Sequence, residues 1–224
     1  MSTYKAIRKI ASAPQADAAL IAALRALPVA AISDNMHRNM GTGSLQPFHK
    51  PTATTMAGTA VTARSRGGDN LTYLRALEFC RPGDVLVIDA GGDLQNAVVG
   101  GILTYYAARI GVVGVVIDGA VRDVAELRER EFPVYARGVT HRGPYKDGPG
   151  EINVPVSVGG MIVHPGDVVV GDQDGLLAIS PADVPLLIDK ARAVLAAEAE
   201  TMRAMQEDRW DRSFIDALEA RCNN

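Results

Sequence analysis

The segment from residue 85 to residue 123 constrains the fold of this chain most, because it predicts two strands joined by a helix. Residues 85–88 (VLVI) form a short apolar run, rich in β-branched side chains and bounded by the turn at 81–84, as expected of a buried strand. Residues 112–117 form a second apolar run without alternation, which is typical of a strand covered on both faces. The segment therefore predicts a β-α-β unit with parallel strands.

Between these strands, apolar residues recur at helical spacing and Gly111 stands where a helix-ending glycine is expected. The apolar residues are Val98, Val99, Ile102, Leu103, Tyr106 and Ile110. Their spacing predicts a helix over residues 96–110, packed on the sheet, after a break at residues 91–92. Ligands of such sheets gather beyond the carboxyl ends of the strands, so we expect the loops at 91–92 and 118–123 to meet in one crevice.

Other segments predict further elements before and after this unit. Residues 18–27 predict a helix stopped by Pro28, and Ser33 is a plausible N-cap for a second helix over residues 34–39. Leu71 lies in a predicted helix that Asp69 or Asn70 caps, and a substrate-binding role for these two polar residues is the less favoured interpretation.

The C-terminal third predicts a β-rich antiparallel meander over residues 154–179 and a helical tail over residues 181–222. The tail is longer than one domain surface needs, so we expect it to pack on a neighbouring subunit. The whole chain, residues 1–224, is predicted to be a single α/β domain with a βαβ core, the meander and a long C-terminal helix.

Composition argues against several classes of protein. A net charge of −3 gives no electrostatic support for a nucleic-acid partner. Cys80 and Cys222 are the only cysteines and have no metal-binding or disulfide-framework spacing, which favours a reducing, cytoplasmic compartment. The first 15 residues contain no apolar leader, and no uninterrupted apolar run approaches the ~20 residues that span a membrane.

Familiar catalytic and nucleotide-binding motifs are absent from the sequence. Residues 91–93 lack the third glycine of a dinucleotide-binding fingerprint, and there is no GxxxxGK[ST] phosphate loop, HExxH or GxSxG. The four histidines are scattered without the spacing of metal ligands.

The adjacent pair Arg122 and Asp123, at the predicted mouth of the sheet, is the best candidate for chemistry. A carboxylate without histidine or cysteine companions suits a hard divalent ion such as Mg²⁺, and an arginine offers a planar fork to a substrate carboxylate. The alternative is structural: Asp123 caps the following helix and Arg122 pairs with Asp118 or Glu126. Spacing alone does not choose between them.

The residues resemble a known family. Gly101, twenty further residues, Arg122-Asp123, two residues and Glu126 reproduce the G-x20-R-D-x2-E/D signature of metal-dependent class II pyruvate aldolases of the 4-hydroxy-4-methyl-2-oxoglutarate type. The same superfamily includes the regulators of ribonuclease E activity A (RraA). The resemblance also covers three further segments, GTAVTA at 58–63, GDN at 68–70 and HPGDVVVGDQDGLLAI at 164–179.

This resemblance implies a role for each matching residue. Asp123 resembles the direct ligand of Mg²⁺ or Mn²⁺, and Glu126 the carboxylate that acts on the ion through a bound water. Arg122 is similar to the residue that contacts the pyruvyl group and stabilises its enolate. The backbone N–H groups of Ile102 and Leu103 are similar to those that bind the pyruvate carboxylate, and Gly101 belongs to the same substrate-binding set because its missing side chain lets the ligand approach the backbone.

The resemblance also has structural implications. It requires a helix that begins near Gly101, whereas the apolar spacing predicts one from residue 96, and the sequence leaves this conflict open. It implies a swivelling β/β/α fold assembled as trimers or hexamers, with sites at subunit interfaces. A carboxylate from the C-terminal helix of the adjacent subunit, Glu198 or Glu200, would reach the metal.

The implied function is a lyase that cleaves 4-hydroxy-4-methyl-2-oxoglutarate-type 2-oxo acids to pyruvate and decarboxylates oxaloacetate through the same enolate. Two alternatives are a non-catalytic regulator that binds a ribonuclease or another protein, and a lyase for a different 2-oxo acid. The identity of the metal, the physiological substrate and the choice between trimer and hexamer do not follow from the sequence.

Overall fold

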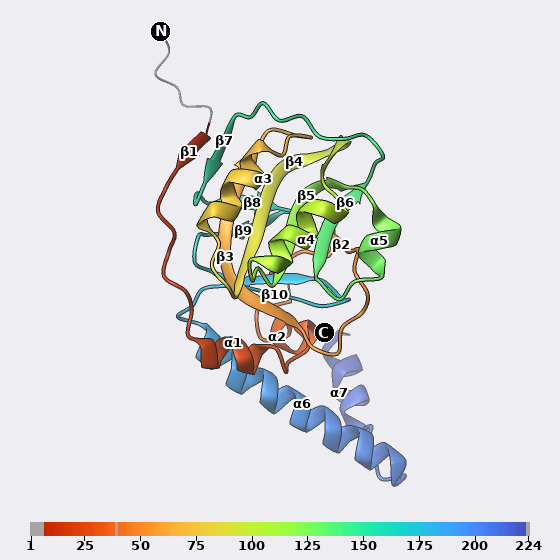
Figure 1. Cartoon of the computed structure of the whole chain (residues 1–224). Coiled ribbons are helices and arrows are strands. Elements are labelled where there is room, and N and C mark those ends of the chain that lie inside the picture. Colours follow the sequence, from red (N-terminus) through yellow and green to blue (C-terminus); the bar gives the residue numbers. More distant parts are fainter. Residues whose placement is uncertain (1–6, 39, 223–224) are drawn as a thin grey trace.

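The computed structural model describes residues 7–38 and 40–222, which form a mixed α/β domain around one large sheet (Figure 1). Within these residues the sheet has nine strands, in the order β1-β7-β3-β4-β5-β6-β2, with β10 and β11 continuing from β3. The strands are β1 (Ile7–Lys9), β2 (Gln46–Pro47), β3 (Met56–Ser65), β4 (Asp84–Val99), β5 (Gly114–Val121), β6 (Val134–Val139), β7 (Gly150–Ile152), β10 (Val168–Gly171) and β11 (Leu176–Ile179). A separate hairpin consists of β8 (Val156–Val158) and β9 (Met161–Val163).

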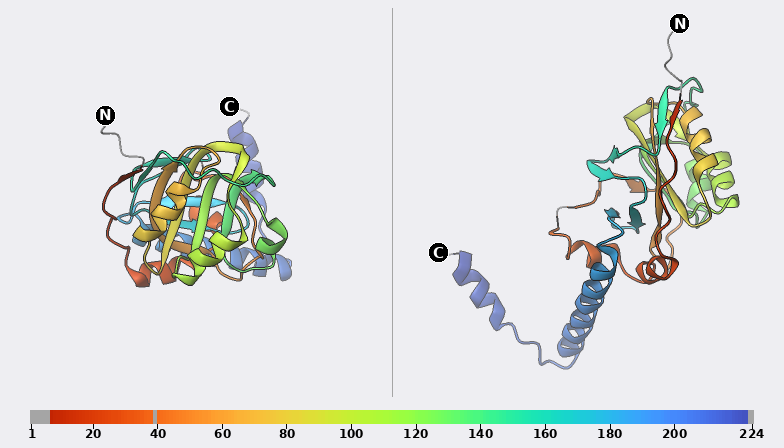
Figure 2. Two further views of the ribbon diagram at one scale, coloured as in Figure 1. Left: turned by 45° about the horizontal axis from the view of Figure 1, so that its top comes forward. Right: turned by 90° about the vertical axis from the view of Figure 1, so that its left-hand side faces the viewer.

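The helices cover one face of this sheet and its lower end. The right-hand view of Figure 2 shows α3, α4 and α5 on one side of the sheet and the β8–β9 hairpin on the other. The helices are α1 (Ala18–Leu24), α2 (Val29–Ser33), α3 (Leu71–Ala76), α4 (Gly101–Arg109), α5 (Val124–Arg128), α6 (Val184–Gln206) and α7 (Ser213–Cys222), with a short 3₁₀ turn η1 (Leu77–Phe79) after α3.

The central strands β3, β4, β5 and β6 pair in parallel, as the β-α-β prediction required. Leu86 and Ile88 of β4 pack in the core beneath the helices, whereas Val85 and Val87 pack on the side of the β8–β9 hairpin. Because both faces of the strand are buried, every position of the run is apolar. The mixed α/β fold with a C-terminal helix is confirmed, as is antiparallel pairing in the meander.

The prediction that a helix begins at residue 96 is wrong. Strand β4 continues to Val99, and Ala97 and Val99 still pair with Ala120 and Val121 of β5, beyond several register shifts. The shifts follow Gly91 and Gly92, which have φ of +65° and +71° and let the strand bulge without ending. Residues 118–121, expected in a loop, are correspondingly the end of β5.

The packed face of α4 also differs from the predicted apolar stripe. Gly101, Thr104 and Ala107 are its buried residues, whereas Ile102 is 81% exposed and Tyr106 is 53% exposed. Small residues therefore face the sheet and let the helix approach closely. The large apolar side chains of its outer face point into solvent.

Of the two predicted N-terminal helices, the first forms as α1, which begins at Ala18 as expected and ends at Leu24, and the second is shifted. The helix after Pro28 is α2, which ends at Ser33, so Ser33 does not cap a helix over residues 34–39; residue 39 itself lies outside the described part of the chain. The N–H of Val29 donates to Asp172 (2.8 Å), an acceptor far along the chain that local sequence could not reveal.

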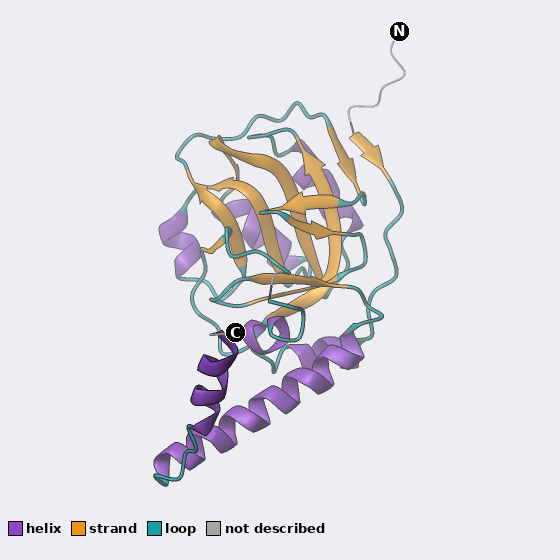
Figure 3. Ribbon diagram, turned by 180° about the vertical axis from the view of Figure 1, so that it is seen from behind, coloured by secondary structure: helices purple, strands orange, loops and turns teal. Residues whose placement is uncertain are grey.

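The predicted tail over residues 181–222 forms two helices rather than one (Figure 3). Helix α6 packs Leu187, Ile188 and Ala191 into a core shared with α1 and α2. It ends where Asp208 takes a left-handed conformation (φ +53°) and the N–H of Arg209 returns to the carbonyl of Ala204 (2.9 Å). None of the described helices combines the length and apolar character that crossing a membrane requires.

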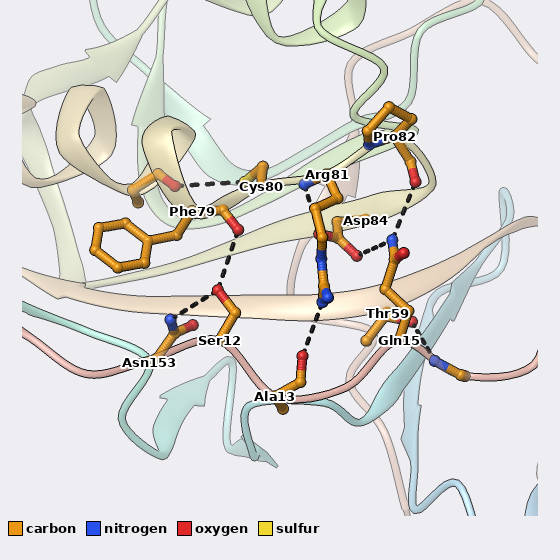
Figure 4. Close-up of polar contacts among 12 residues, drawn as sticks. Ser12, Ala13, Gln15, Thr59, Phe79, Cys80, Arg81, Pro82, Asp84 and Asn153 are labelled. Carbon is orange, nitrogen blue, oxygen red and sulfur yellow. Dashed lines mark hydrogen bonds and ion pairs between the residues drawn. The ribbon is translucent and has the colours of Figure 1, made fainter.

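An extended N-terminal segment runs along the edge of the sheet from β1 to α1 (Figure 1) and is fastened to the turn before β4 (Figure 4). The fully buried carboxylate of Asp84 accepts hydrogen bonds from the Gln15 side chain (2.8 Å) and the Arg81 backbone N–H (2.7 Å). Arg81 in turn donates to the carbonyl of Ala13 (2.8 Å), and Ser12 donates to the carbonyl of Phe79 (3.1 Å). One buried carboxylate thus joins the segment to the sheet.

We expect Asp84→Ala to lower the free energy of unfolding by about 2–4 kcal/mol, because the Gln15 side chain and the Arg81 N–H lose a charged, fully buried acceptor together. Urea unfolding followed by circular dichroism measures the change. Gln15→Ala removes only one of the partners and should cost about 1 kcal/mol. Equal losses in the two variants would contradict the central role of Asp84.

Candidate active site

Two neighbouring strand-to-helix turns form the candidate site. Strand β4 ends at Val99 and α4 begins at Gly101; beside it, β5 ends at Val121 and α5 begins at Val124. The backbone N–H of Arg122 donates to the carbonyl of Val99 (3.0 Å), which extends the pairing of the two strands into the turns. Arg122 and Asp123 therefore lie directly beside the start of α4.

The side chain of Asp123 accepts a hydrogen bond from the neighbouring turn, at the start of α4. Its backbone is left-handed (φ +60°, ψ +35°), and its side chain makes no capping bond to α5, although it occupies the N-cap position. Its Oδ2 atom instead accepts the N–H of Gly101 at 3.0 Å. Aspartate tolerates the left-handed region better than most residues, but such a conformation outside glycine is typical of functional sites.

The structural alternative for the Arg-Asp pair is wrong. Asp118 pairs with Arg137, and Glu126 pairs with Arg130, so neither is the partner of Arg122. The nearest carboxylate oxygen to the Arg122 guanidinium is Oδ2 of Asp123, 3.7 Å from Nε. Both side chains are about two-fifths exposed and are available to a ligand.

Two glycines make room for the carboxylates. A Cβ atom at Gly100 would overlap the carboxylate of Asp123, and one at Gly101 would overlap the carboxylate of Glu126. Asp123 and Glu126 therefore both stand against the first turn of α4. This close approach explains the glycine at the start of the signature better than backbone flexibility does, because neither glycine has a positive φ.

Arg130 holds Glu126 in this position, and the sequence analysis did not identify it. Its guanidinium pairs with Glu126 and donates to the carbonyl of Gly101 (2.9 Å). It also lies over the ring of Tyr105, 5.4 Å from the centroid. The spacing of Glu126 and Arg130, four residues apart on one helical face, is a signal that could have predicted the pair.

A small pocket of about 50 Å³ opens between the two turns. Within the described part of the chain, the N–H groups of Ile102 and Leu103 donate no hydrogen bond, as is usual in the first turn of a helix. Together with the helix dipole, these groups favour an anion. The lining residues are Asn70, Val98, Val99, Gly100, Ile102, Leu103, Arg122, Asp123 and Pro144.

The loop that carries Pro144 is fastened to the rest of the domain. Asp69 accepts the backbone N–H groups of Asp147 (2.6 Å) and Gly148 (2.9 Å), and Asn96 donates to the carbonyl of Gly143 (2.6 Å). The loop is thus a fixed wall of the pocket.

Asp69 and Asn70 divide the roles that the sequence analysis left open between them. Asp69, the residue before the N-cap position, accepts the N–H of Leu71 (2.8 Å) and so closes the turn that leads into α3. The side chain of Asn70 makes no capping bond and lines the pocket instead. Neither side chain makes the predicted N-cap bond, and the role of Asp69 is structural.

The donor set at the two turns fits a hard divalent cation. Asp123 and Glu126 supply carboxylate oxygens against the Gly100–Gly101 turn, which has no room for a Cβ atom. The described residues contain no group of three or more His, Cys, Asp or Glu side chains that could hold a metal. Two carboxylates suit Mg²⁺ or Mn²⁺, ions that keep several waters or take a further ligand from another chain.

The two carboxylates expected to act from a neighbouring subunit lie on α6. Glu200 pairs with Arg203 (2.7 Å) and Arg209 (2.9 Å), and Glu198 lines a groove that Asp34 and Arg38 also line. Within one chain they belong to the C-terminal helix rather than to the pocket. Their role in an adjacent subunit's site stays a prediction.

Cys80 is not a second candidate for chemistry. It is partly buried beside η1, and burial raises the pKa of its thiol to about 12, with the nearby Asp84 carboxylate adding to the effect. A thiol with such a pKa is protonated at neutral pH and is a poor nucleophile.

Comparison with known proteins reveals relatives in both sequence and structure. The family described as RraA-like: Aldolase/RraA matches residues 29–178, a range that includes Gly101, Arg122, Asp123 and Glu126. A Halalkalibacterium halodurans protein named as a candidate 4-hydroxy-4-methyl-2-oxoglutarate aldolase is 36% identical over 196 residues, which are 87% of this chain and 92% of the relative. A Thermus thermophilus protein named 4-hydroxy-4-methyl-2-oxoglutarate aldolase is 42% identical over 111 residues, 50% of this chain and 68% of the relative.

A solved structure confirms the fold. Streptomyces coelicolor RraAS2, described as an unusual member of the RNase ES inhibitor RraA protein family, has a TM-score of 0.76 and 27% sequence identity. The match covers 85% of this chain and 98% of that chain. The predicted family resemblance is thereby confirmed, and the relatives include both named aldolases and a named ribonuclease inhibitor.

We expect Gly101→Ala to lower the free energy of unfolding by about 1–3 kcal/mol, because the added methyl group displaces the Glu126 carboxylate. Glu126→Ala removes the overlapping atoms, so the double variant should recover at least about 1 kcal/mol relative to the sum of the single changes. Urea unfolding of the four proteins gives this coupling energy.

Gly43→Ala is the matched control for the glycine substitution, because nothing lies within 4 Å of a Cβ atom there. It should leave stability unchanged. Strictly additive effects of Gly101→Ala and Glu126→Ala would show that the carboxylate does not occupy the space beside Gly101.

Proposed function

The chain belongs to the RraA-like (Aldolase/RraA) family, and from that premise we propose that it is a divalent-metal-dependent lyase. Its substrates would be 4-hydroxy-4-methyl-2-oxoglutarate-type 2-oxo acids, cleaved by retro-aldol reaction to pyruvate. The observation that carries the proposal is the position of Asp123 and Glu126 against the first turn of α4, beside Arg122 and two free backbone N–H groups.

The first turn of α4 supplies the binding site for the acid. A 2-oxo acid carries its carboxylate next to the oxo group, so a site needs an anion-binding element and a second group directed at the neighbouring oxygen. The N–H groups of Ile102 and Leu103 provide the first, at the positive end of a helix dipole. The half-exposed guanidinium of Arg122, across the pocket, provides the second.

In the cleavage step the C3–C4 bond of the substrate breaks and the 4-hydroxyl loses its proton, which leaves a carbonyl on C4. The electron pair of the broken bond remains on C3 and is delocalised onto the 2-oxo oxygen as the pyruvate enolate, and a proton added at C3 completes pyruvate. Arg122 stabilises the negative charge where it develops. A divalent ion held by Asp123, with Glu126 nearby, supplies Lewis acidity toward the 2-oxo group when bound.

The same site would decarboxylate oxaloacetate. In that compound the C3–C4 bond breaks with loss of carbon dioxide and leaves the same enolate of pyruvate. The groups that bind the carboxylate and stabilise the enolate are common to both reactions, so one set of residues serves both substrates.

The competing function is a protein regulator without catalysis, as the description of the Streptomyces relative suggests for that protein. A docking surface has no need of two carboxylates that require glycine at both Gly100 and Gly101. This arrangement supports the lyase, and turnover distinguishes the two.

The outer face of α4 supports an oligomer with the site at a subunit interface. Ile102 lines the pocket and is 81% exposed, and Tyr105 and Tyr106 beside it are 57% and 53% exposed. Large apolar side chains grouped on one helical face mark a surface that a partner covers. We include a homo-oligomer, a trimer or hexamer, in the proposal.

Pyruvate release coupled to lactate dehydrogenase tests the reaction, with 4-hydroxy-4-methyl-2-oxoglutarate or oxaloacetate as substrate and Mg²⁺ or EDTA present. We expect turnover by the wild type with Mg²⁺ only, and none by Asp123→Ala. Arg122→Lys keeps the charge but loses the planar fork, and should lower kcat about 10²–10³-fold.

Glu129→Ala is the control, because it removes an exposed carboxylate later along the same helical segment. It should leave kcat within a factor of about two, as for most surface substitutions. A folded, Mg²⁺-loaded wild type that releases no pyruvate from either compound would refute the lyase and leave the regulator as the better account.

Tyr106→Glu tests the oligomer. Because a charge at the centre of an apolar interface is costly to bury, sedimentation equilibrium should show dissociation to smaller species with the far-ultraviolet spectrum retained. The same change at Tyr145, which is similarly exposed but lies on another segment, serves for comparison. A wild type that sediments as a monomer would contradict this part of the proposal.

A further inference from the structure

Asn70 is a buried polar residue whose side chain makes no hydrogen bond to the described residues of the domain. It is 3% exposed, and its Oδ1 atom is buried without a hydrogen-bond partner. A buried acceptor without a donor destabilises the fold relative to a paired one. Since Asn70 lines the pocket between the two turns, a ligand in the pocket can supply the missing donor.

The surrounding residues already perform the structural roles that an asparagine at this position could have. Asp69 accepts the N–H of Leu71 at the start of α3 and holds the loop at 147–148. The backbone of Asn70 donates to the carbonyl of Tyr145 (3.0 Å) and accepts from the N–H of Leu74 (3.0 Å), and any residue could make these two bonds. Its side-chain amide is therefore free for recognition.

The chemistry of the proposed substrate identifies the group that Asn70 would bind. At neutral pH the ionised carboxylates and the oxo group of a 4-hydroxy-2-oxo acid are acceptors only. The hydroxyl on C4 is the one donor, and Oδ1 of Asn70 is an acceptor without a donor.

We propose that Asn70 binds the 4-hydroxyl group of the substrate and so selects hydroxylated 2-oxo acids for aldol cleavage. This inference rests on the proposed function. An amide oxygen is too weak a base to remove the proton, so Asn70 orients the O–H bond and another group accepts the proton. Oxaloacetate has no hydroxyl at this position, and its decarboxylation would not depend on Asn70.

The test compares two substrates in one variant. Asn70→Leu keeps the approximate shape of the side chain and removes its hydrogen bonding. We expect kcat/KM for 4-hydroxy-4-methyl-2-oxoglutarate to fall about 10–100-fold, the loss typical of one buried hydrogen bond. The rate of oxaloacetate decarboxylation should stay within about threefold of the wild-type rate.

Thr72→Val is the matched control. Thr72 lies on the same helix and its Oγ1 atom is also buried without a partner, but it does not line the pocket. This change should leave both reactions unaltered. Urea unfolding should give Asn70→Leu a midpoint equal to or above that of the wild type, whereas a structural role for the amide would lower it.

Two results would overturn the proposal. Equal losses with both substrates would assign Asn70 to the pyruvyl group, and unchanged kinetics with both would assign it no part in binding. The decisive quantity is therefore the loss of kcat/KM for 4-hydroxy-4-methyl-2-oxoglutarate divided by the loss of the oxaloacetate decarboxylation rate.

A binding measurement keeps the test independent of turnover. With EDTA in place of Mg²⁺, so that the hydroxy acid is not cleaved, 4-hydroxy-4-methyl-2-oxoglutarate and pyruvate should each raise the melting temperature of the wild type. Asn70→Leu should lose most of the shift from the hydroxy acid and keep the shift from pyruvate. If the wild type binds both compounds but cleaves neither substrate, the lyase proposal fails while this pattern still supports Asn70; absence of the difference overturns the role of Asn70.

Discussion

The hydrogen bond from the Gly101 N–H to the Asp123 carboxylate (3.0 Å) joins the two turns on which the candidate site is built. It forms because β4 and β5 remain paired to their last residues, Val99 and Val121, and enter their helices side by side. The pairing of β4 with β5 therefore fixes where Arg122 and Asp123 lie relative to the backbone N–H groups at the start of α4. A site built on paired strands is more rigid than one carried by a flexible loop.

The same arrangement has a structural cost that the surrounding residues offset. Asp123 has a left-handed backbone, and its carboxylate and that of Glu126 stand close together beside the first turn of α4. The N–H of Gly101 and the guanidinium of Arg130 each bind one of these carboxylates. Local departures from the most stable conformation and charge pattern are expected where a protein binds a ligand.

The prediction from sequence was most accurate where a local pattern is compatible with only one structure. The continuous apolar runs predicted buried parallel strands, and the spacing from Gly101 to Arg122 predicted a family that the comparisons confirm. The prediction failed at residues 96–99, where apolar residues at helical spacing form the end of a strand. Periodicity cannot distinguish these states in a short apolar run, and pairing with β5 decides between them.

The sequence by itself determined the class of the fold, the family and the Arg122-Asp123 pair, because these depend on residue type and on spacing along the chain. Only the tertiary structure decided that Asp123 binds Gly101 rather than capping α5, and that the Asn70 amide lies unpaired in the pocket. Only the tertiary structure showed that Asp69 has a structural role whereas the side chain of Asn70 is unpaired. Hydrogen bonds between segments 22 or more residues apart depend on how strands pair and helices pack, and no local pattern encodes them.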